Sequence, residues 1–173
     1  MPLSQVSGAV RPLGRRFAGD NGERELKMKE IKTSVEIQAS AERVWQVLTD
    51  FSNYPQWNPF IRQISGTVRE GTRLEVTLGP PGTRSMTFRP VLLKVQANRE
   101  LRWLGRLLVP GLFDGEHSFV IETIDQRRVR FIHSEEFSGL LVPVFARSLD
   151  ANTQCGFAEM NQAIKTQAEQ PSV

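Results

Sequence analysis

The chain has 173 residues, 39% hydrophobic and 24% charged, which fits one soluble globular domain with a sizeable core. No apolar run approaches the roughly 18 residues that span a bilayer, so we expect no stable membrane insertion. The formal charge of +3 is too small to argue for a nucleic-acid partner. The single cysteine, Cys155, excludes an internal disulfide and is compatible with a cytoplasmic protein.

Residues 1–29 differ from the rest of the chain. They contain several glycines, two prolines and no apolar periodicity, which is typical of a disordered segment. They also lack the apolar stretch of about 7–15 residues that a secretory signal needs. We expect a disordered leader, or an extension upstream of a natural start at Met28. The sequence thus predicts one folded domain over 30–168 and a short tail over 169–173.

The first elements are a strand and a helix. Residues 30–38 alternate between apolar and polar side chains, which predicts a half-buried strand. Ser40 then offers a hydroxyl that can cap a helix start, and the following apolar positions give that helix one buried face. Residues 50–58 are typical of a short second helix or turn, which Pro55 and Pro59 interrupt.

Strand signals then recur at short spacing until the C-terminal segment. The predicted strands, separated by Gly, Pro and Asn turn residues, are 61–68, 73–78, 86–96, 101–107, 116–124 and 129–137. Residues 143–168 carry apolar side chains at steps of three and four, which predicts a long amphipathic helix. Consecutive hairpins indicate an antiparallel sheet, and the long helix must cover its apolar face. The predicted class is therefore α+β.

Several runs of residues together resemble one known superfamily. They are VEIQASAERVW (35–45), DFSNYPQWNPF (50–60), ELRW (100–103), GEHSF (115–119), FIHSEEFSGLL (131–141) and GFAEMN (156–161). Over about 30–168 the chain resembles the START-like, polyketide cyclase/dehydrase and lipid-transport (SRPBCC) superfamily, and within it a bacterial branch.

The resemblance implies the helix-grip fold, a curved antiparallel sheet wrapped around a long C-terminal helix, with two short helices after the first strand. It also implies a cavity between the sheet and that helix. Members of the superfamily carry lipids, bind steroids or plant hormones, cyclise polyketides or chaperone hydrophobic partners, so the fold does not choose among these functions.

The implied cavity makes the inward-facing side chains the candidate site. Strand side chains alternate, so on the last strand Phe131 shares its face with His133 and Glu135, which then point into an apolar interior. The same rule groups His117 with Phe119. A buried carboxylate and imidazole can support acid–base chemistry. Alternatively, a neighbouring arginine, backbone group or water satisfies each of them structurally, and both interpretations stay open.

We expect no metal and no cofactor. A three-residue loop over 126–128 would place His117 opposite Phe137 and His133 opposite Ile121. The two histidines would then lie on the order of 13 Å apart, too far to share a zinc ion.

The remaining candidates come from the loop after the first helices, from the strand over 101–107 and from the long helix. The aromatic residues of the loop form either a pocket rim or part of the core. Gly156 interrupts the helix, which indicates either close approach of a ligand or of the sheet, or sequence drift without a structural role. The predicted ligand-binding residues are Tyr54, Trp57, Phe60, Trp103, His117, Phe119, Phe131, His133, Glu135, Asn152 and Gly156.

The predicted function is binding of a small hydrophobic or amphipathic molecule, such as a lipid, an isoprenoid or a polyketide-like compound, in an internal cavity. One alternative is a cyclase- or dehydratase-like enzyme without metal, in which Glu135 or His133 is the acid–base group. A second is an interaction module for a hydrophobic protein partner. The residues do not identify the ligand or the reaction, and they do not choose between a monomer and a homodimer.

Overall fold

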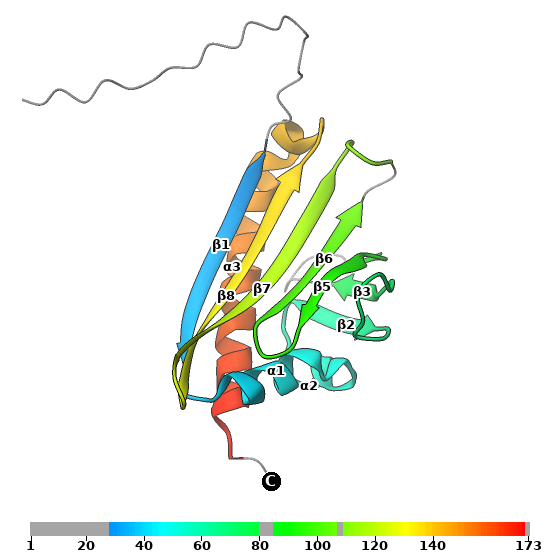
Figure 1. Ribbon diagram of the computed structural model, residues 1–173. Coiled ribbons are helices and arrows are strands. Elements are labelled where there is room, and N and C mark those ends of the chain that lie inside the picture. Colours follow the sequence, from blue (N-terminus) through cyan, green and yellow to red (C-terminus); the bar gives the residue numbers. More distant parts are fainter. Residues whose placement is uncertain (1–27, 80–84, 107–108, 172–173) are drawn as a thin grey trace, which may run out of the picture.

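The computed structural model describes residues 28–79, 85–106 and 109–171, apart from the side chains of residues 145–152. The predicted leader therefore lies almost entirely outside the described residues. In chain order (Figure 1) the elements are β1 (Lys29–Ile37), α1 (Ala41–Thr49), the 3-10 turn η1 (Phe51–Asn53), α2 (Tyr54–Trp57), β2 (Ile61–Ser65), β3 (Glu75–Leu78), β4 (Met86–Phe88), β5 (Val91–Gln96), β6 (Glu100–Arg106), β7 (Asp114–Asp125), β8 (Arg128–Ser138) and α3 (Val142–Glu169).

Five strands form the main sheet, in the order β1-β8-β7-β6-β5, and every neighbouring pair is antiparallel. The long helix α3 runs along one face of this sheet, behind β1 and β8 in Figure 1. A smaller sheet, β2-β3-β4, lies beside β5 and is linked to it by a bridge between Arg73 and Val91. The α+β class, the antiparallel sheet, the two short helices and the long C-terminal helix are confirmed.

One predicted strand is divided in two. The segment 86–96 forms β4, which pairs with β3, and β5, which pairs with β6. Pro90 stands at the break, and it has no N–H to continue a ladder. Its carbonyl instead accepts a hydrogen bond from the backbone N–H of Leu74 at 2.9 Å. The proline thus lets one segment of chain serve both sheets.

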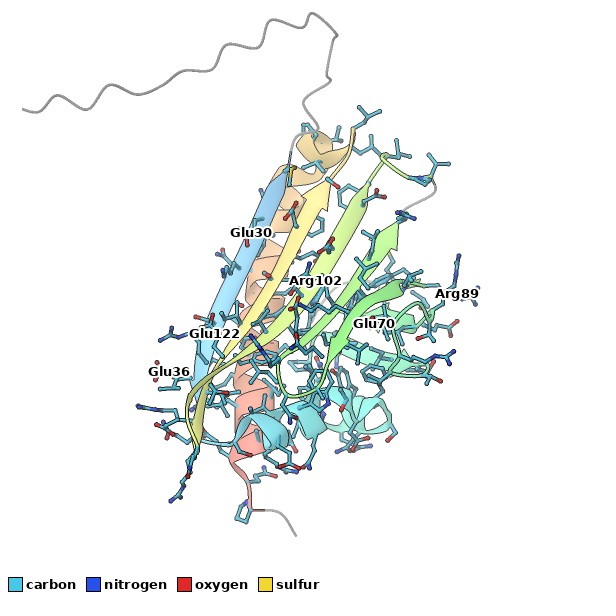
Figure 2. The ribbon with its side chains drawn as sticks, viewed as in Figure 1. Glu30, Glu36, Glu70, Arg89, Arg102 and Glu122 are labelled. Atoms are coloured by element: carbon cyan, nitrogen blue, oxygen red, sulfur yellow. The ribbon has the colours of Figure 1, made fainter. Side chains whose placement is uncertain are left out.

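The alternation along β1 decides which face of the sheet meets α3. Ile31 and Ile37 are buried, whereas Glu30 and Glu36 point away from α3 on the outer face, where Arg102 of β6 also lies (Figure 2). Because side chains alternate along a strand, Thr33 faces inward with the two isoleucines. On β1 the inner face is therefore apolar, with Thr33 as a polar residue between the two buried isoleucines.

The helix α3 is fixed to the end of β1 by hydrogen bonds near its C-terminus. The Glu169 carboxylate accepts from the backbone N–H of Gln38 at 2.7 Å, and the Lys165 ammonium donates to the carbonyl of Glu36 at 2.8 Å. Phe157, Met160 and Ile164 are fully buried along the helix. Among the described residues, no helix combines the length and the hydropathy needed to cross a membrane.

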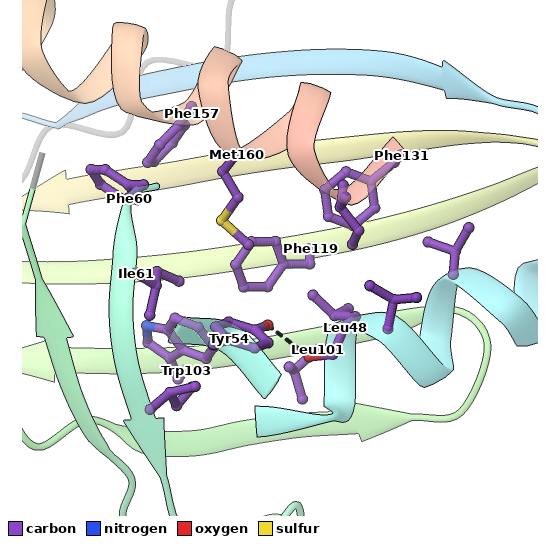
Figure 3. Packing of buried hydrophobic residues seen from close by; sticks show 14 of the residues in the cluster. Leu48, Tyr54, Phe60, Ile61, Leu101, Trp103, Phe119, Phe131, Phe157 and Met160 are labelled. Atoms are coloured by element: carbon purple, nitrogen blue, oxygen red, sulfur yellow. Dashed lines mark hydrogen bonds between the residues drawn. The ribbon is translucent and has the colours of Figure 1, made fainter. Parts of the chain in front are cut away.

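The core lies between the inner face of the main sheet, the short helices and α3. Figure 3 shows Met160 of α3 above Phe119 of β7, with Trp103 of β6 and Tyr54 of α2 on the opposite side. These side chains have almost no exposed surface. Aromatic side chains therefore surround the inward-facing positions of β7 and β8, which include the candidate residues His117 and His133.

Candidate functional site

Two histidines meet inside this aromatic core. The strands β7 and β8 pair with His117 opposite Glu135 and with Phe119 opposite His133, so the two histidines are diagonal neighbours. Their Nε2 atoms lie 2.6 Å apart, which is a hydrogen-bond distance. His117 and His133 are 3% and 0% exposed. The structure thus contains a buried, directly hydrogen-bonded histidine pair.

The predicted separation of about 13 Å between the histidines is wrong. The prediction assumed a three-residue loop, but only residues 126 and 127 separate β7 from β8, and the register also shifts between Thr123 and Asp125. This change moves His133 two positions along β8 relative to His117, because each residue shift displaces facing side chains by one strand step. The distance argument against a shared metal therefore fails.

The environment of the histidine pair keeps His133 neutral. Its ring stacks on Phe157 with the centroids 3.6 Å apart, while the His117 ring stacks on Trp103 at 4.9 Å. Burial lowers the pKa of His133 well below its usual value, and the neighbouring His117 lowers it further. The Asn161 side chain acts in the opposite direction and is outweighed. The His133 ring is therefore uncharged at neutral pH.

Glu135 extends the pair toward the surface. Its Oε2 atom lies 3.5 Å from Nδ1 of His117, and its side chain is 17% exposed. Gly115, on the neighbouring strand β7, makes room for the carboxyl group, since a Cβ atom there would lie 2.7 Å from Oε1 of Glu135. The polar groups thus run from the buried His133 through His117 to a partly exposed carboxyl.

Two further polar residues next to His133 are not among the predicted site residues. Asn161 of α3 donates from Nδ2 to Oγ1 of Thr33 at 2.9 Å, and Thr33 donates to the carbonyl of His133 at 3.5 Å. A signal for Asn161 exists in the sequence, because it stands four positions after Phe157, on the apolar face of the helix. The sequence does not show which strand residue that amide meets.

The Phe60 ring packs directly against the backbone of α3 at Gly156. A Cβ atom at position 156 would lie 2.6 Å from Cε2 of Phe60, so the glycine lets the Phe60 ring lie against α3. The Phe60 ring in turn meets the edge of Phe157 at 5.5 Å. The glycine predicts that some group lies close to this part of the helix, and that group is the Phe60 side chain.

Tyr54 and Trp57 lie away from the histidine pair. Tyr54 is fully buried, and its hydroxyl donates to the carbonyl of Leu48 at 2.7 Å, so that donor is already used within the protein. Burial, reinforced by Asp50, raises the pKa of this hydroxyl. Trp57 is half-buried and lines an open cleft of about 370 Å³ at the C-terminal end of α3, together with Arg43, Gln46, Val47, Thr49, Asp50, Asn53 and Gln167.

The other predicted residues are aromatic neighbours of the histidines or lie outside the described side chains. Phe119 stacks with Phe131 at 5.8 Å and meets the Trp103 ring at 5.2 Å. The side chain of Asn152 is outside the described residues. Within the described ranges, no three His, Cys, Asp or Glu side chains are grouped so that they could hold a metal ion. The geometry supports hydrogen bonding and proton transfer at the histidine pair.

Comparisons with known proteins agree with this fold. A family model described as polyketide cyclase/dehydrase and lipid transport matches residues 28–165. A search of curated proteins returns no match for this chain. Among solved structures, the Zhui aromatase/cyclase of a Streptomyces species superposes with a TM-score of 0.65 at 19% identity, covering 83% of this chain and 94% of that one.

Two further structures show the same architecture. A START superfamily protein from Mycobacterium smegmatis gives a TM-score of 0.63 at 22% identity, over 82% of this chain and 97% of that one. Norcoclaurine synthase from Thalictrum flavum gives 0.66 at 16% identity, over 95% and 100%. Identities this low establish the fold alone. The family match decides the assignment: the chain belongs to the polyketide cyclase/dehydrase and lipid-transport family.

Proposed function

We propose that the protein binds a small hydrophobic or amphipathic molecule between the main sheet and α3, with the polar end of the molecule at Glu135. The observation that carries the proposal is the polar chain of His133, His117 and Glu135 inside an aromatic shell. Buried polar groups are costly unless they are hydrogen-bonded, so a chain that approaches the surface at a carboxyl group is typical of a ligand site.

The aromatic shell and the polar chain have different roles in this binding. Contact with Trp103, Phe119 and Phe137 would stabilise an apolar ligand by roughly 25 cal/mol for each Å² buried, before the cost of ordering it. Glu135 and His117 would orient the polar end of the ligand. A polar group of the ligand loses its hydrogen bonds to water when it is buried, so it is stable only where it meets a hydrogen-bonding group of the protein.

Native mass spectrometry of the freshly purified full chain tests the proposal. We expect a complex heavier than the chain by the mass of one small molecule, which denaturation releases for identification. Titration of the emptied protein with the identified molecule should then restore the complex. A chain that carries no such molecule and rebinds none from a panel of lipids, isoprenoids and polyketides would contradict the proposal.

Two variants locate the bound molecule. Gly115→Phe pushes a side chain into the Glu135 carboxyl group and should abolish binding, because a Cβ atom at position 115 would already lie 2.7 Å from Oε1 of Glu135. Trp57→Ala opens the separate cleft at the end of α3 and should leave binding unchanged. Circular dichroism of both variants controls for folding. The reverse pattern would place the ligand in the outer cleft instead.

A second candidate function, acid–base catalysis, is favoured by the 2.6 Å contact between the two Nε2 atoms. A direct histidine–histidine hydrogen bond that leads to a carboxyl group can move a proton between the interior and the surface. In this case Glu135→Gln should lower the turnover of a poly-β-ketone substrate by at least about 10²-fold while the fold is preserved. Unchanged turnover would exclude Glu135 from that role.

A further inference from the structure

Exposed apolar side chains gather at one end of the molecule. Among the described residues, seven large hydrophobic side chains are exposed, and four of them, from 55% to 72% exposed, are Met28, Val109, Leu140 and Val144. Met28 precedes β1, Val109 lies between β6 and β7, Leu140 lies between β8 and α3, and Val144 lies in the first turn of α3. The starts of β1, β7 and α3 lie at the same end of the molecule, opposite α1 (Figure 1). We call these four residues the apolar tip.

Two similar segments of the chain supply most of the apolar tip. The sequence Leu-Leu-Val-Pro occurs at residues 107–110 and again at 140–143. Immediately beside them, the backbone N–H of Leu141 donates to the carbonyl of Leu112 at 3.0 Å. Gly139 permits this approach, because a Cβ atom there would lie 2.7 Å from the carbonyl oxygen of Leu112. The exposed side chains therefore project from two turns that are hydrogen-bonded to each other.

The size of the apolar tip favours one kind of partner. Single exposed apolar side chains are common, but a group of them on one surface marks a site of interaction with a protein or a membrane. A stable protein interface takes about 20–30 residues and about 800 Å² from each partner, which four side chains cannot supply. At a membrane surface, each apolar side chain that enters the boundary between headgroups and acyl chains contributes to binding. The tip therefore fits a lipid surface better than a second protein.

The charges around the apolar tip favour an anionic surface. The carboxylate of Asp114, beside the tip, accepts from the N–H of Gly111 at 3.1 Å and lies 3.9 Å from Nε of Arg106, so its charge is balanced within the protein. Residues 1–27, which lead into the tip at Met28, contain five basic and three acidic residues. Apolar side chains combined with basic residues are the two signals that hold peripheral proteins on anionic membranes.

We propose that the apolar tip docks the protein reversibly on an anionic lipid surface. Val109, Leu140 and Val144 enter the boundary between headgroups and acyl chains, and the basic residues of 1–27 add attraction to the headgroups. The contact is with the membrane surface, and no segment of the chain crosses the bilayer. This docking goes beyond the ligand binding proposed above and does not depend on it, because it uses side chains outside the histidine site.

Co-sedimentation of the full chain with lipid vesicles tests the docking. One set of vesicles contains phosphatidylcholine and phosphatidylglycerol in equal parts, and the other contains phosphatidylcholine alone. We expect the protein to bind the anionic vesicles at least about tenfold more tightly than the neutral ones. Added salt should weaken binding to the anionic vesicles, because it screens the attraction between the basic residues and the headgroups.

Matched pairs of substitutions locate the contact. Val109→Glu together with Val144→Glu removes two apolar side chains from the tip and should weaken binding at least about tenfold. Leu93→Glu together with Ile124→Glu adds the same charge at exposed apolar positions away from the tip and should change binding by less than about threefold. Val144→Trp should strengthen binding by at least about threefold, because tryptophan prefers the membrane interface. Circular dichroism of each variant controls for folding.

Three outcomes would overturn the proposal. In the first, wild type binds neither kind of vesicle. In the second, the two double variants bind equally, which would show that the tip is not the contact. In the third, sedimentation velocity without lipid shows a dimer that only Val109→Glu with Val144→Glu separates, which would assign the tip to a second copy of this chain. None of these outcomes changes the small-molecule complex measured by native mass spectrometry, so the two proposals fail independently.

Discussion

The glycine at position 156 has a local steric reason. The Phe60 ring lies where a side chain of residue 156 would begin, and the same ring touches Phe157 one residue further along α3. A glycine inside a helix costs up to about 1 kcal/mol relative to alanine, and here that cost is offset by the packing of Phe60 beside the histidine pair. A single missing Cβ atom thus allows Phe60, the residue before β2, to pack against α3.

Gly156→Ala should therefore destabilise the protein, although alanine is the better helix former. We expect the free energy of unfolding to fall by about 1–3 kcal/mol, the usual cost of forcing an extra atom into a packed core. Urea denaturation measures the change. In a Phe60→Ala background the same substitution should be neutral or stabilising by up to about 1 kcal/mol. Equal destabilisation in both backgrounds would show that Phe60 is not the obstacle.

At the scale of elements, the short helix α1 joins the strand β1 to the end of α3. The Ser40 hydroxyl accepts from the backbone N–H of Arg43 at 3.2 Å, and the Arg43 guanidinium donates to the carbonyl of Gln167 at 3.3 Å. Since α1 has only nine residues, its first turn depends on this cap more than a long helix would. The cap thus helps to hold α1 against α3.

Ser40→Ala should lower the free energy of unfolding by about 1 kcal/mol, because it leaves a backbone donor of the first turn without its partner. The matched control is Ser52→Ala, which removes an exposed hydroxyl that donates to Asp50 at 2.6 Å. That change should stay within about 0.5 kcal/mol. Thermal and urea unfolding of both variants give the comparison. Equal losses of unfolding free energy in the two variants would show that the cap made by Ser40 does not stabilise the protein.

At the scale of the whole molecule, the buried His133 couples stability to pH. The folded protein holds this ring with a lowered pKa, whereas the unfolded chain has the ordinary value of about 6.5. Below that pH, His133 is protonated in the unfolded chain but stays neutral in the folded protein. Stability is therefore fully present above about pH 6.5 and decreases as the pH falls.

Between pH 7.5 and 5.0, wild type should lose up to about 2 kcal/mol of unfolding free energy, because one proton contributes at most about 1.36 kcal/mol per pH unit below 6.5. His133→Phe keeps an aromatic ring against Phe157 and should flatten this dependence, even though its overall stability is lower. Urea denaturation at several pH values measures both slopes. A variant slope as steep as that of wild type would assign the acid sensitivity to other groups.

The sequence by itself determined the order and type of most elements and the inward direction of the candidate residues. Alternation placed His117, His133 and Glu135 on inner faces, and the steps of three and four in 143–168 predicted α3, since these local periods are set by backbone geometry. The pattern over 86–96 predicts one strand and misses the break at Pro90, although a proline has no N–H to continue a ladder.

Only the tertiary structure decided which of these residues meet. A two-residue loop with a register shift, in place of the assumed three-residue loop, reduces the offset of the histidines along the strands from four positions, about 13 Å, to two, about 7 Å. The two rings then reach across this offset, so that their Nε2 atoms lie 2.6 Å apart. Asn161 reaches Thr33 from 128 positions away, and Gly156 meets Phe60 across the core. The physical reason is that periodicity fixes the face of each side chain, whereas register and helix placement depend on the packing of the whole chain.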